Sequence, residues 1–298
     1  MNYLVTGATG FIGSSLVSEL LATGQSVNYL ARKRSINLDS RAAFHIWNLD
    51  EKLSLHSVPR LDVVINLAGE PVAQRWTPEI KRRIYDSRVQ GTRRLVSAIG
   101  ELRYKPAVLV SASAIGYYGD RGEEILTEAS APGNDFLAKL CVDWEREALG
   151  AGEFGVRVVL LRIAMVLGQG GALARMVVPF RLGIGGQLGS GRQWISWIHL
   201  NDMVRLLVFA AENDAIRGAL NAGSPDPIRN ADFTKALASA VHRPALLPAP
   251  RFALKLVLGE MVDFVFASER VVPQVAQAAG FSFRYPTLDA ALEAALLE

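Results

Sequence analysis

The chain has 298 residues, 50% hydrophobic and 20% charged, which is enough to bury a large core as one large domain or two subdomains. Its net charge of +3 lies in short clusters without a recognisable nucleic-acid-binding module, and it has no run of about 18 apolar residues, so we expect neither a nucleic-acid nor a membrane partner. The single cysteine, Cys141, excludes an internal disulfide framework, and a strand at the very start leaves no room for a signal peptide, so we expect a cytoplasmic protein.

The first element is a short apolar strand, residues 3–5, followed by the turn TGATGFIG and then by apolar residues at helical spacing. Strand, glycine turn and helix in this order predict a dinucleotide site. Gly7 permits the tight turn, Gly10 lets the backbone approach a pyrophosphate, and Gly13 lets the helix pack on the strand. A glycine-rich turn without a ligand is the alternative. We expect cofactor contacts from Gly7, Thr9, Gly10, Phe11, Ile12 and Gly13.

A second strand, residues 26–31, ends at a cluster of cations that begins with Arg32 and Lys33. An acidic residue there would bind the ribose 2′-hydroxyl of NAD, whereas cations suit the 2′-phosphate of NADP. We therefore expect NADP(H), bound in part by Arg32 and Lys33; a solvated basic loop is the alternative. A third strand is expected at residues 43–47, with Asp50 after it near the adenine.

Residues 62–69 form a nearly continuous apolar run that is typical of a strand buried on both faces of a parallel sheet. Its carboxyl end is where ligands bind in open α/β sheets, so we expect cofactor contacts there. Those contacts are assigned to Leu67, Ala68 and Gly69. A long helix should follow from about Thr77, with Thr77 as N-cap and Pro78 in the first turn.

Further strands are expected at residues 106–113 and 156–162, with a helix between them that starts at Asn134 or Asp135 and carries a buried Cys141. Strands that alternate with helices predict a Rossmann-type, doubly wound parallel α/β sheet. Arg162, at the end of the last of these strands, is a further candidate for cofactor contact.

Beyond about residue 165 the regular alternation of strands and helices is replaced by glycine-rich turns and short elements. Residues 195–199 resemble a strand, Asn201 or Asp202 can cap the next helix, and a final helix over about 288–297 should pack on the body. We expect an NADP-binding domain at 1–165 and a smaller α/β substrate-binding subdomain at 166–298. The four histidines lack ligand spacing, so no metal site is expected.

Several motifs together suggest a family. TGATGFIG, NLAG, SASAIGYYG and WIHLNDM resemble the extended short-chain dehydrogenase/reductases. NLAGEP, RQWISWIHLNDM, NAGSPDPIRNADF and RPALLPAP are similar to the epimerase-like subgroup often labelled nucleoside-diphosphate-sugar epimerase, which has its own C-terminal segment, here about 245–298. This resemblance covers essentially the whole chain.

The resemblance implies hydride transfer coupled to proton transfer by a serine, a tyrosine and a lysine four residues after the tyrosine. Ser113 matches the serine and Lys139 matches the lysine, which would also bind the cofactor, but Asp135 stands where the tyrosine is expected. An aspartate is ordinarily ionised and is a poor acid unless burial changes that. Tyr117 or Tyr118 could supply a phenol instead. Alternatively, Asp135 is a helix N-cap and the tyrosines are packing residues.

Weaker candidates for substrate contact follow the NLAG motif and lie in the later glycine-rich loop: Glu70, Arg75, Trp76, Arg192 and Trp194. Ordinary packing or solvation is the alternative for each. The combined expectation is an NADP(H)-dependent oxidoreductase or epimerase, monomeric or homodimeric, acting on a carbonyl or hydroxyl of a small, possibly sugar-like substrate. A catalytically weak NADP(H)-binding sensor, or a role in cell division, is the alternative.

Overall fold

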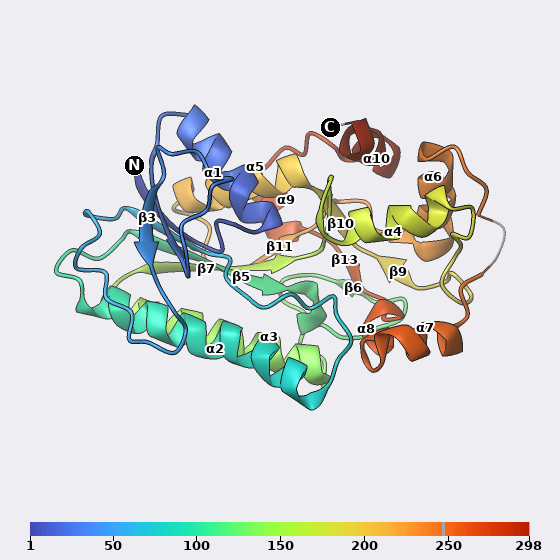
Figure 1. Cartoon of the computed structure of the whole chain (residues 1–298), viewed down its shortest axis with the longest axis horizontal. Helices are drawn as coiled ribbons and strands as arrows, with labels where there is room; N and C mark the ends of the chain where they lie inside the picture. Colours follow the sequence, from blue (N-terminus) through green and yellow to red (C-terminus); the bar gives the residue numbers. More distant parts are fainter. Residues whose placement is uncertain (246–247, 298) are drawn as a thin grey trace.

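The computed structural model describes residues 1–245 and 248–297, and at its centre lies a seven-stranded parallel sheet (Figure 1). The strand order is β3-β2-β1-β4-β5-β7-β11, so the predicted doubly wound sheet is confirmed. Residues 246–247, within the RPALLPAP motif, and residue 298 lie outside the described residues. The strands are β1 (Asn2–Thr6), β2 (Ser26–Ala31), β3 (Ala43–Ile46), β4 (Val63–Asn66), β5 (Val108–Ala114), β7 (Arg157–Ile163) and β11 (Gly218–Ala222).

Helices cover both faces of this sheet, as Figure 1 shows. Successive side chains of a strand point to opposite faces, so Tyr3 and Val5 of β1 join one core cluster, with residues of α1 and α5, whereas Leu4 joins a second, with residues of α2. This double burial explains the apolar runs in the sequence. The main covering helices are α1 (Phe11–Ala22), α2 (Pro78–Glu101), α3 (Phe136–Leu149), α5 (Leu200–Glu212) and α9 (Gln274–Ala278).

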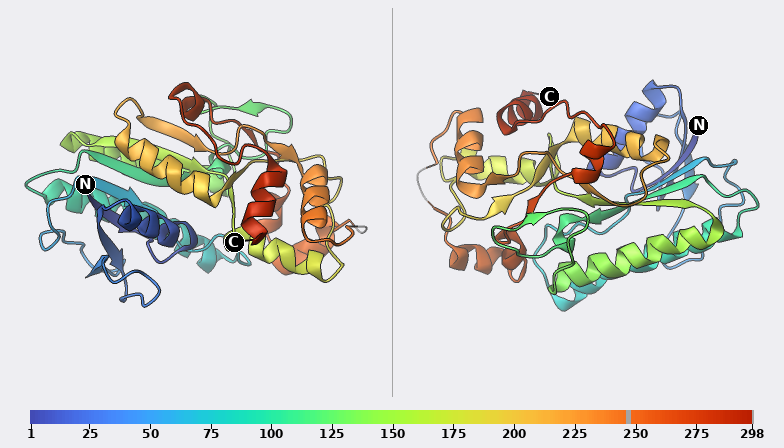
Figure 2. Two further views of the ribbon diagram at one scale, coloured as in Figure 1. Left: turned by 90° about the horizontal axis from the view of Figure 1, so that it is seen from above. Right: turned by 180° about the vertical axis from the view of Figure 1, so that it is seen from behind.

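A third apolar cluster lies beyond one end of the sheet, where α4, α6 and α10 pack around Trp197 and Phe233. Figures 1 and 2 show these helices and the α7–α8 segment grouped at the end away from the N-terminus. The helices are α4 (Gly171–Arg181), α6 (Asn230–Ala240), α7 (Arg251–Leu258), α8 (Met261–Val265) and α10 (Leu288–Leu297). The minor strands pair as β6 (Ile125–Leu126) with β13 (Arg270–Val271), β8 (Met165–Leu167) with β10 (Trp197–His199), and β9 (Trp194–Ile195) with β12 (Ile228–Arg229).

Several local expectations are confirmed. The Thr77 hydroxyl caps α2 by accepting a hydrogen bond from the Ile80 amide at 3.3 Å, and Pro78 occupies the first turn. Cys141 is buried in α3, and α10 packs against α6. Within the described residues no helix is long and apolar enough to span a bilayer.

Two local expectations are wrong. The strand expected over 195–199 is divided into β9 and β10 at Ser196, because β9 pairs with β12 whereas β10 pairs with β8. The Ser196 hydroxyl binds the backbone before and within β13. The cap of α5 is His199, whose ring nitrogen accepts from the Asn201 amide at 3.1 Å; Asp202 binds the backbone amides of residues 284 and 285 instead. The sheet also includes β11, which lies beyond residue 165, and the division at 165 stays a prediction.

Candidate active site

The turn between β1 and α1 uses its glycines in two ways. A Cβ on Gly7, whose φ is +69°, would lie 2.6 Å from the carbonyl carbon of Leu67, and a Cβ on Gly13 would overlap the carbonyl oxygen of Gly7. Gly10 is exposed, with ordinary extended dihedrals (φ −83°, ψ 174°). Gly7 and Gly13 therefore permit close packing, whereas Gly10 leaves open backbone at the amino end of α1, where a phosphate group fits.

The loop after β4 is fixed against this turn by the buried Thr6 side chain. The Thr6 hydroxyl accepts hydrogen bonds from the amides of Leu67 and Ala68 at 3.2 and 3.1 Å and donates to the Asn66 side chain at 2.7 Å. Leu67, Ala68 and the exposed Gly69 are thereby held at the carboxyl ends of neighbouring strands β1 and β4. This is the position at which open α/β sheets bind ligands.

Phe11 packs against a second glycine turn, residues 168–171. A Cβ on Gly168 would lie 2.8 Å from the Phe11 ring, and one on Gly170 would lie 2.5 Å from it. The glycines of this turn therefore make room for the ring of Phe11, the first residue of α1. Thr9 is exposed and Ile12 is half-buried, and the predicted cofactor contacts of these residues stay predictions.

The end of β2 presents the expected cations to solvent. The side chains of Arg32, Lys33 and Arg34 are exposed, as is Asp50 after β3. The next acidic residue along the chain, Asp39, accepts hydrogen bonds from the neighbouring Arg41 guanidinium at 2.7 to 3.1 Å. No acidic residue therefore takes the place of a ribose-binding carboxylate at the end of this strand.

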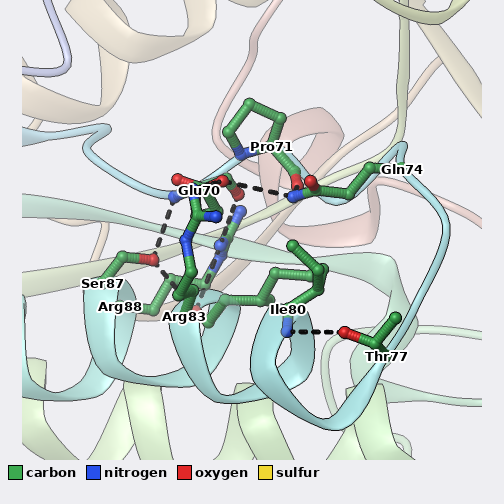
Figure 3. Close-up of polar contacts among 9 residues, drawn as sticks. Glu70, Pro71, Gln74, Thr77, Ile80, Arg83, Ser87 and Arg88 are labelled. Atoms are coloured by element: carbon green, nitrogen blue, oxygen red, sulfur yellow. Dashed lines mark hydrogen bonds and ion pairs between the residues drawn. The ribbon is translucent and has the colours of Figure 1, made fainter.

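Glu70 is held by helix α2, as the close-up in Figure 3 shows. Its carboxylate forms an ion pair with Arg83 at 2.6 Å and accepts from Gln74 at 3.3 Å, while its backbone binds Ser87 and Arg88. The Glu70 side chain thus serves to fasten the loop after the NLAG motif. Its predicted contact with substrate stays a prediction.

Ser113 belongs to a buried polar network at the end of β5. Its hydroxyl donates to the Glu145 carboxylate at 2.7 Å, and the same carboxylate forms a bidentate pair with Arg162, both contacts being 2.9 Å long. All three side chains are buried. Arg162 is therefore engaged inside the protein, and its predicted contact with the cofactor stays a prediction.

The tyrosine pair extends this network. The Tyr118 hydroxyl accepts from Arg162 at 3.0 Å and donates to Asn221 of β11 at 2.6 Å, and the Arg162 guanidinium lies over the Tyr117 ring at 3.5 Å from its centroid. Burial raises the pKa of Tyr118 to about 12 although Arg162 opposes the shift. The Tyr118 phenol thus stays protonated at neutral pH and is not available there to accept a proton as a general base.

Asp135 is the N-cap of α3. Its carboxylate accepts from the Ala138 amide at 2.9 Å, and Lys139, one turn later, is exposed. The structure therefore shows the capping alternative for Asp135, and this leaves a catalytic role for Asp135 as a prediction.

Replacing Asp135 with alanine should lower the free energy of unfolding by about 1 kcal/mol, because the Ala138 amide loses its acceptor. Asparagine keeps an acceptor at this position and should cost much less. Urea denaturation of both variants measures the difference. A loss in the alanine variant that is no larger than in the asparagine variant would contradict the capping role.

A cavity of about 730 Å³ lies between the N-terminus of α3, the loop that follows η1 (Ile115–Tyr117) and the segment from α7 to residue 269. Three of the residues predicted for catalysis or substrate binding line it: Trp76, Tyr118 and Asp135. Trp76 is buried edge-on against Phe136, with the ring centroids 5.5 Å apart. Asp135, which occupies the position of the family tyrosine, thus lies in the same cavity as the aromatic side chains of Trp76 and Phe136.

The remaining substrate candidates lie outside this lining in the described part of the chain. Arg75 and Arg192 are exposed. The guanidinium groups of Arg229 and Arg270 both lie over the Trp194 ring, at 4.2 and 4.3 Å from its centroid. An indole held in this way matches the packing alternative, and substrate contacts by these residues stay predictions.

Sequence reasoning missed two acidic residues of the site. Glu145 is the acceptor for Ser113, and Glu269 lines the cavity from the C-terminal segment. Position on the inner face of α3, one turn from the buried Cys141, was an available signal for Glu145, whereas nothing local marked Glu269. The described residues hold no group of three or more potential metal ligands.

Sequence comparison then places the chain. The profile described as the NAD dependent epimerase/dehydratase family matches residues 3–223. The chain belongs to this family. A second profile, described as a domain of unknown function (DUF1731), matches residues 249–295. The resemblance to epimerase-like extended short-chain dehydrogenase/reductases, with a C-terminal segment of their own, is thereby confirmed.

Similar proteins of this family occur in plants, bacteria and humans. The epimerase family protein SDR39U1 homolog of Arabidopsis thaliana, labelled chloroplastic, is 41% identical over 300 residues, which cover 99% of this chain and 86% of that protein. The epimerase family protein YfhF of Bacillus subtilis is 37% identical, covering 98% and 97%. The crystal structure of human epimerase family protein SDR39U1 with NADPH is 31% identical, with full coverage of both chains and a TM-score of 0.90.

Proposed function

We propose that this chain is an NADP(H)-dependent oxidoreductase or epimerase that acts on a carbonyl or hydroxyl group of a small molecule. The observation that carries the proposal is the open backbone of Gly10 at the amino end of α1, beside the fixed loop at Leu67 and Ala68. These residues fit a dinucleotide, because the free N–H groups and dipole of α1 suit its phosphates. Family membership supports the same reaction class.

The preference for NADP(H) over NAD(H) rests on the end of β2. Arg32 and Lys33 are exposed there, and the strand ends without an acidic residue. A guanidinium pairs well with a phosphate, and nothing at this position would favour an unmodified ribose. The similar human protein was solved with NADPH, which supports the same assignment.

Replacing Arg32 with alanine should weaken NADPH binding by about 10- to 100-fold, because a charge-assisted contact of about 1.5–3 kcal/mol is lost. NADH binding should change little. Fluorescence titration with both nucleotides measures the ratio. The exposed Arg41, which is paired with Asp39, provides a matched control, since Arg41→Ala should leave both affinities nearly unchanged. Equal losses for NADPH and NADH in Arg32→Ala would remove the 2′-phosphate argument.

The chain's own residues have distinct proposed tasks. When bound, the nicotinamide supplies or accepts the hydride, and the protein orients the substrate and manages protons. Asp135 and Tyr118 line the cavity, and Lys139 is proposed to contact the cofactor ribose. Ser113 would reach substrate only by releasing its hydrogen bond to Glu145, so in this conformation it holds the end of β5 against α3.

Deuteride transfer tests the proposed reaction. We would incubate the protein with NADPH deuterated at the pro-S C4 position, the face that the family resemblance implies, and with the small-molecule fraction of a cell lysate. A metabolite that gains deuterium establishes net reduction. A pair of stereoisomers that interconvert without label, only when the nucleotide is present, establishes an epimerase. If NADPH binding is confirmed but neither of these two results is observed, the proposal is contradicted.

A catalytically weak NADP(H) sensor is the second candidate. It is favoured by the hydroxyl groups of Ser113 and Tyr118, which are both engaged in buried hydrogen bonds with protein side chains. In a sensor, NADPH binding would occur without turnover. The deuteride experiment separates this candidate from the first.

A further inference from the structure

The active-site cavity contains one buried carboxyl group that the protein itself does not satisfy. Glu269 lines the cavity and is only 6% exposed, and its Oε1 atom has no hydrogen-bond partner among the described residues. Buried polar atoms are nearly always hydrogen-bonded, because leaving one unpaired is costly. Because Glu269 lines the cavity and no described residue hydrogen-bonds its carboxyl group, a ligand in the cavity is the candidate partner for this group.

The backbone around Glu269 is firmly held. Its amide donates to the Trp194 carbonyl at 3.2 Å, and its own carbonyl accepts from the Ser196 hydroxyl at 2.7 Å. Strand β13 begins at the next residue and pairs with β6. The carboxyl group is thus attached to a backbone segment that is held in place by hydrogen bonds, as a binding group requires.

The charges around the cavity do not favour an anionic ligand. Its cations are already paired with carboxylates, Lys81 with Glu260 and Arg251 with Asp263. Arg121 is likewise paired with its neighbour in sequence, Glu124. A phosphate would have to compete with these pairs and would also face the cavity carboxylates.

The charged groups that act on Glu269 are Asp135, from the start of α3, and Asp120, from the loop after η1. Burial, which has the largest effect, and these two carboxylates together raise the pKa of Glu269 to about 8. At neutral pH the group is therefore mainly a neutral carboxylic acid, which has an O–H donor as well as an acceptor.

Aromatic side chains supply the apolar part of the cavity. Trp76, Phe136, Phe264 and Phe266 all belong to its lining. Apolar rings combined with a few fixed polar groups are typical of sites for small uncharged ligands.

We propose that Glu269 anchors the substrate in this cavity by a hydrogen bond to a hydroxyl or carbonyl oxygen, and that the substrate group bound there is uncharged. This inference rests on the proposed function, because it takes the cavity to be the substrate site. It also distinguishes the site from one that holds a phosphate or a sugar nucleotide diphosphate beside α8.

Metabolite retention tests the anchor. NADPH-loaded protein would be dialysed against the small-molecule fraction of a cell lysate, and retained compounds identified by mass spectrometry. We expect uncharged hydroxyl or carbonyl compounds, which an excess of inorganic phosphate does not displace. Glu269→Gln keeps a neutral hydrogen-bonding group and should retain them within about threefold, whereas Glu269→Leu should lose about tenfold. The exposed Glu153, changed to Gln and Leu, is the matched control and should change nothing.

Contrary outcomes are clear. Retained phosphates or nucleotides other than NADP(H), no retained metabolite at all, or equal retention by wild type and Glu269→Leu would overturn the anchor. Adding deuterated NADPH separates this from the proposed function. A labelled metabolite that Glu269→Leu retains as well as the wild type does overturns the anchor and leaves the proposed reaction intact. A metabolite that needs Glu269 but is neither labelled nor interconverted overturns the reaction and leaves the anchor.

The pH dependence of stability gives a second readout that needs no ligand. The pKa of Glu269 is about 8 in the folded chain, whereas the usual pKa of a glutamate is 4.5. Between these two pH values the unfolded chain has released the Glu269 proton while the folded chain keeps it. Stability should therefore fall as pH rises through this window. Glu269→Gln should lack this contribution, so its free energy of unfolding should rise relative to that of the wild type as the pH approaches 8. Parallel curves for the two proteins would show that Glu269 is ionised in the fold and would overturn its role as a neutral donor.

Discussion

Replacing Glu145 with leucine is expected to lower the free energy of unfolding by about 3–5 kcal/mol. The ion pair between Glu145 and Arg162 is buried, with side chains 7% and 5% exposed. Without the carboxylate, the Arg162 guanidinium remains buried without its counter-charge, and the Ser113 hydroxyl loses its acceptor. An unpaired buried charge costs far more than the pair itself contributes.

Urea denaturation with matched variants measures this effect. Glu147, two residues later on α3, pairs with Arg93 at the surface, and Glu147→Leu should cost about 1 kcal/mol or less. The double variant Glu145→Leu/Arg162→Met removes both charges and should recover much of the lost stability. A cost for Glu145→Leu that matches the surface control would show that solvent reaches the pair.

Replacing Gly10 with valine should weaken NADPH binding by at least about 100-fold, which corresponds to losing two charge-assisted contacts of about 1.5 kcal/mol each. The backbone of Gly10 is extended, a conformation that valine also adopts, and a Cβ there would meet only the Gly7 carbonyl oxygen, in a tight contact of 3.2 Å. The valine side chain would occupy the open position where the pyrophosphate is expected. The free energy of unfolding should therefore fall far less than a Cβ at Gly13 would lower it, because the contact at Gly13 is only 2.2 Å.

Gly13→Val provides the contrast for this prediction. Its Cβ would overlap the Gly7 carbonyl oxygen, so this variant should unfold more easily and lose nucleotide binding as a consequence. Fluorescence titration and urea denaturation of both variants separate the two effects. Unchanged NADPH affinity in Gly10→Val would mean that the turn has only a structural role.

The parts of the molecule that were predictable are those set by local rules. The glycine turn at residues 6–13, the capping of α2 by Thr77 and the buried runs of the sheet strands all depend on neighbours within a few residues. Such signals are present in the sequence itself. The family motifs added the positions of Ser113 and Lys139, which local patterns alone do not mark.

The parts that were not predictable depend on contacts between distant residues. Ser113 and Glu145 are 32 residues apart, and Tyr118 meets Asn221 across 103 residues. Glu269 enters the cavity because Ser196 and Trp194 hold its backbone there, which no short pattern reveals. The cap of α5 was misplaced because Asp202, a good capping residue, is used by distant backbone amides.

Cys141 has a practical consequence. It is the only thiol in the chain, it is 2% exposed, and burial raises its pKa to about 12. Alkylating reagents attack the thiolate, so the folded chain protects this sulfur almost completely. Its rate of labelling therefore reports how often α3 separates from the sheet beneath the cavity. Any slowing of that rate by added NADPH would therefore measure how much the nucleotide stabilises the packing of α3 against the sheet, and it needs no engineered probe.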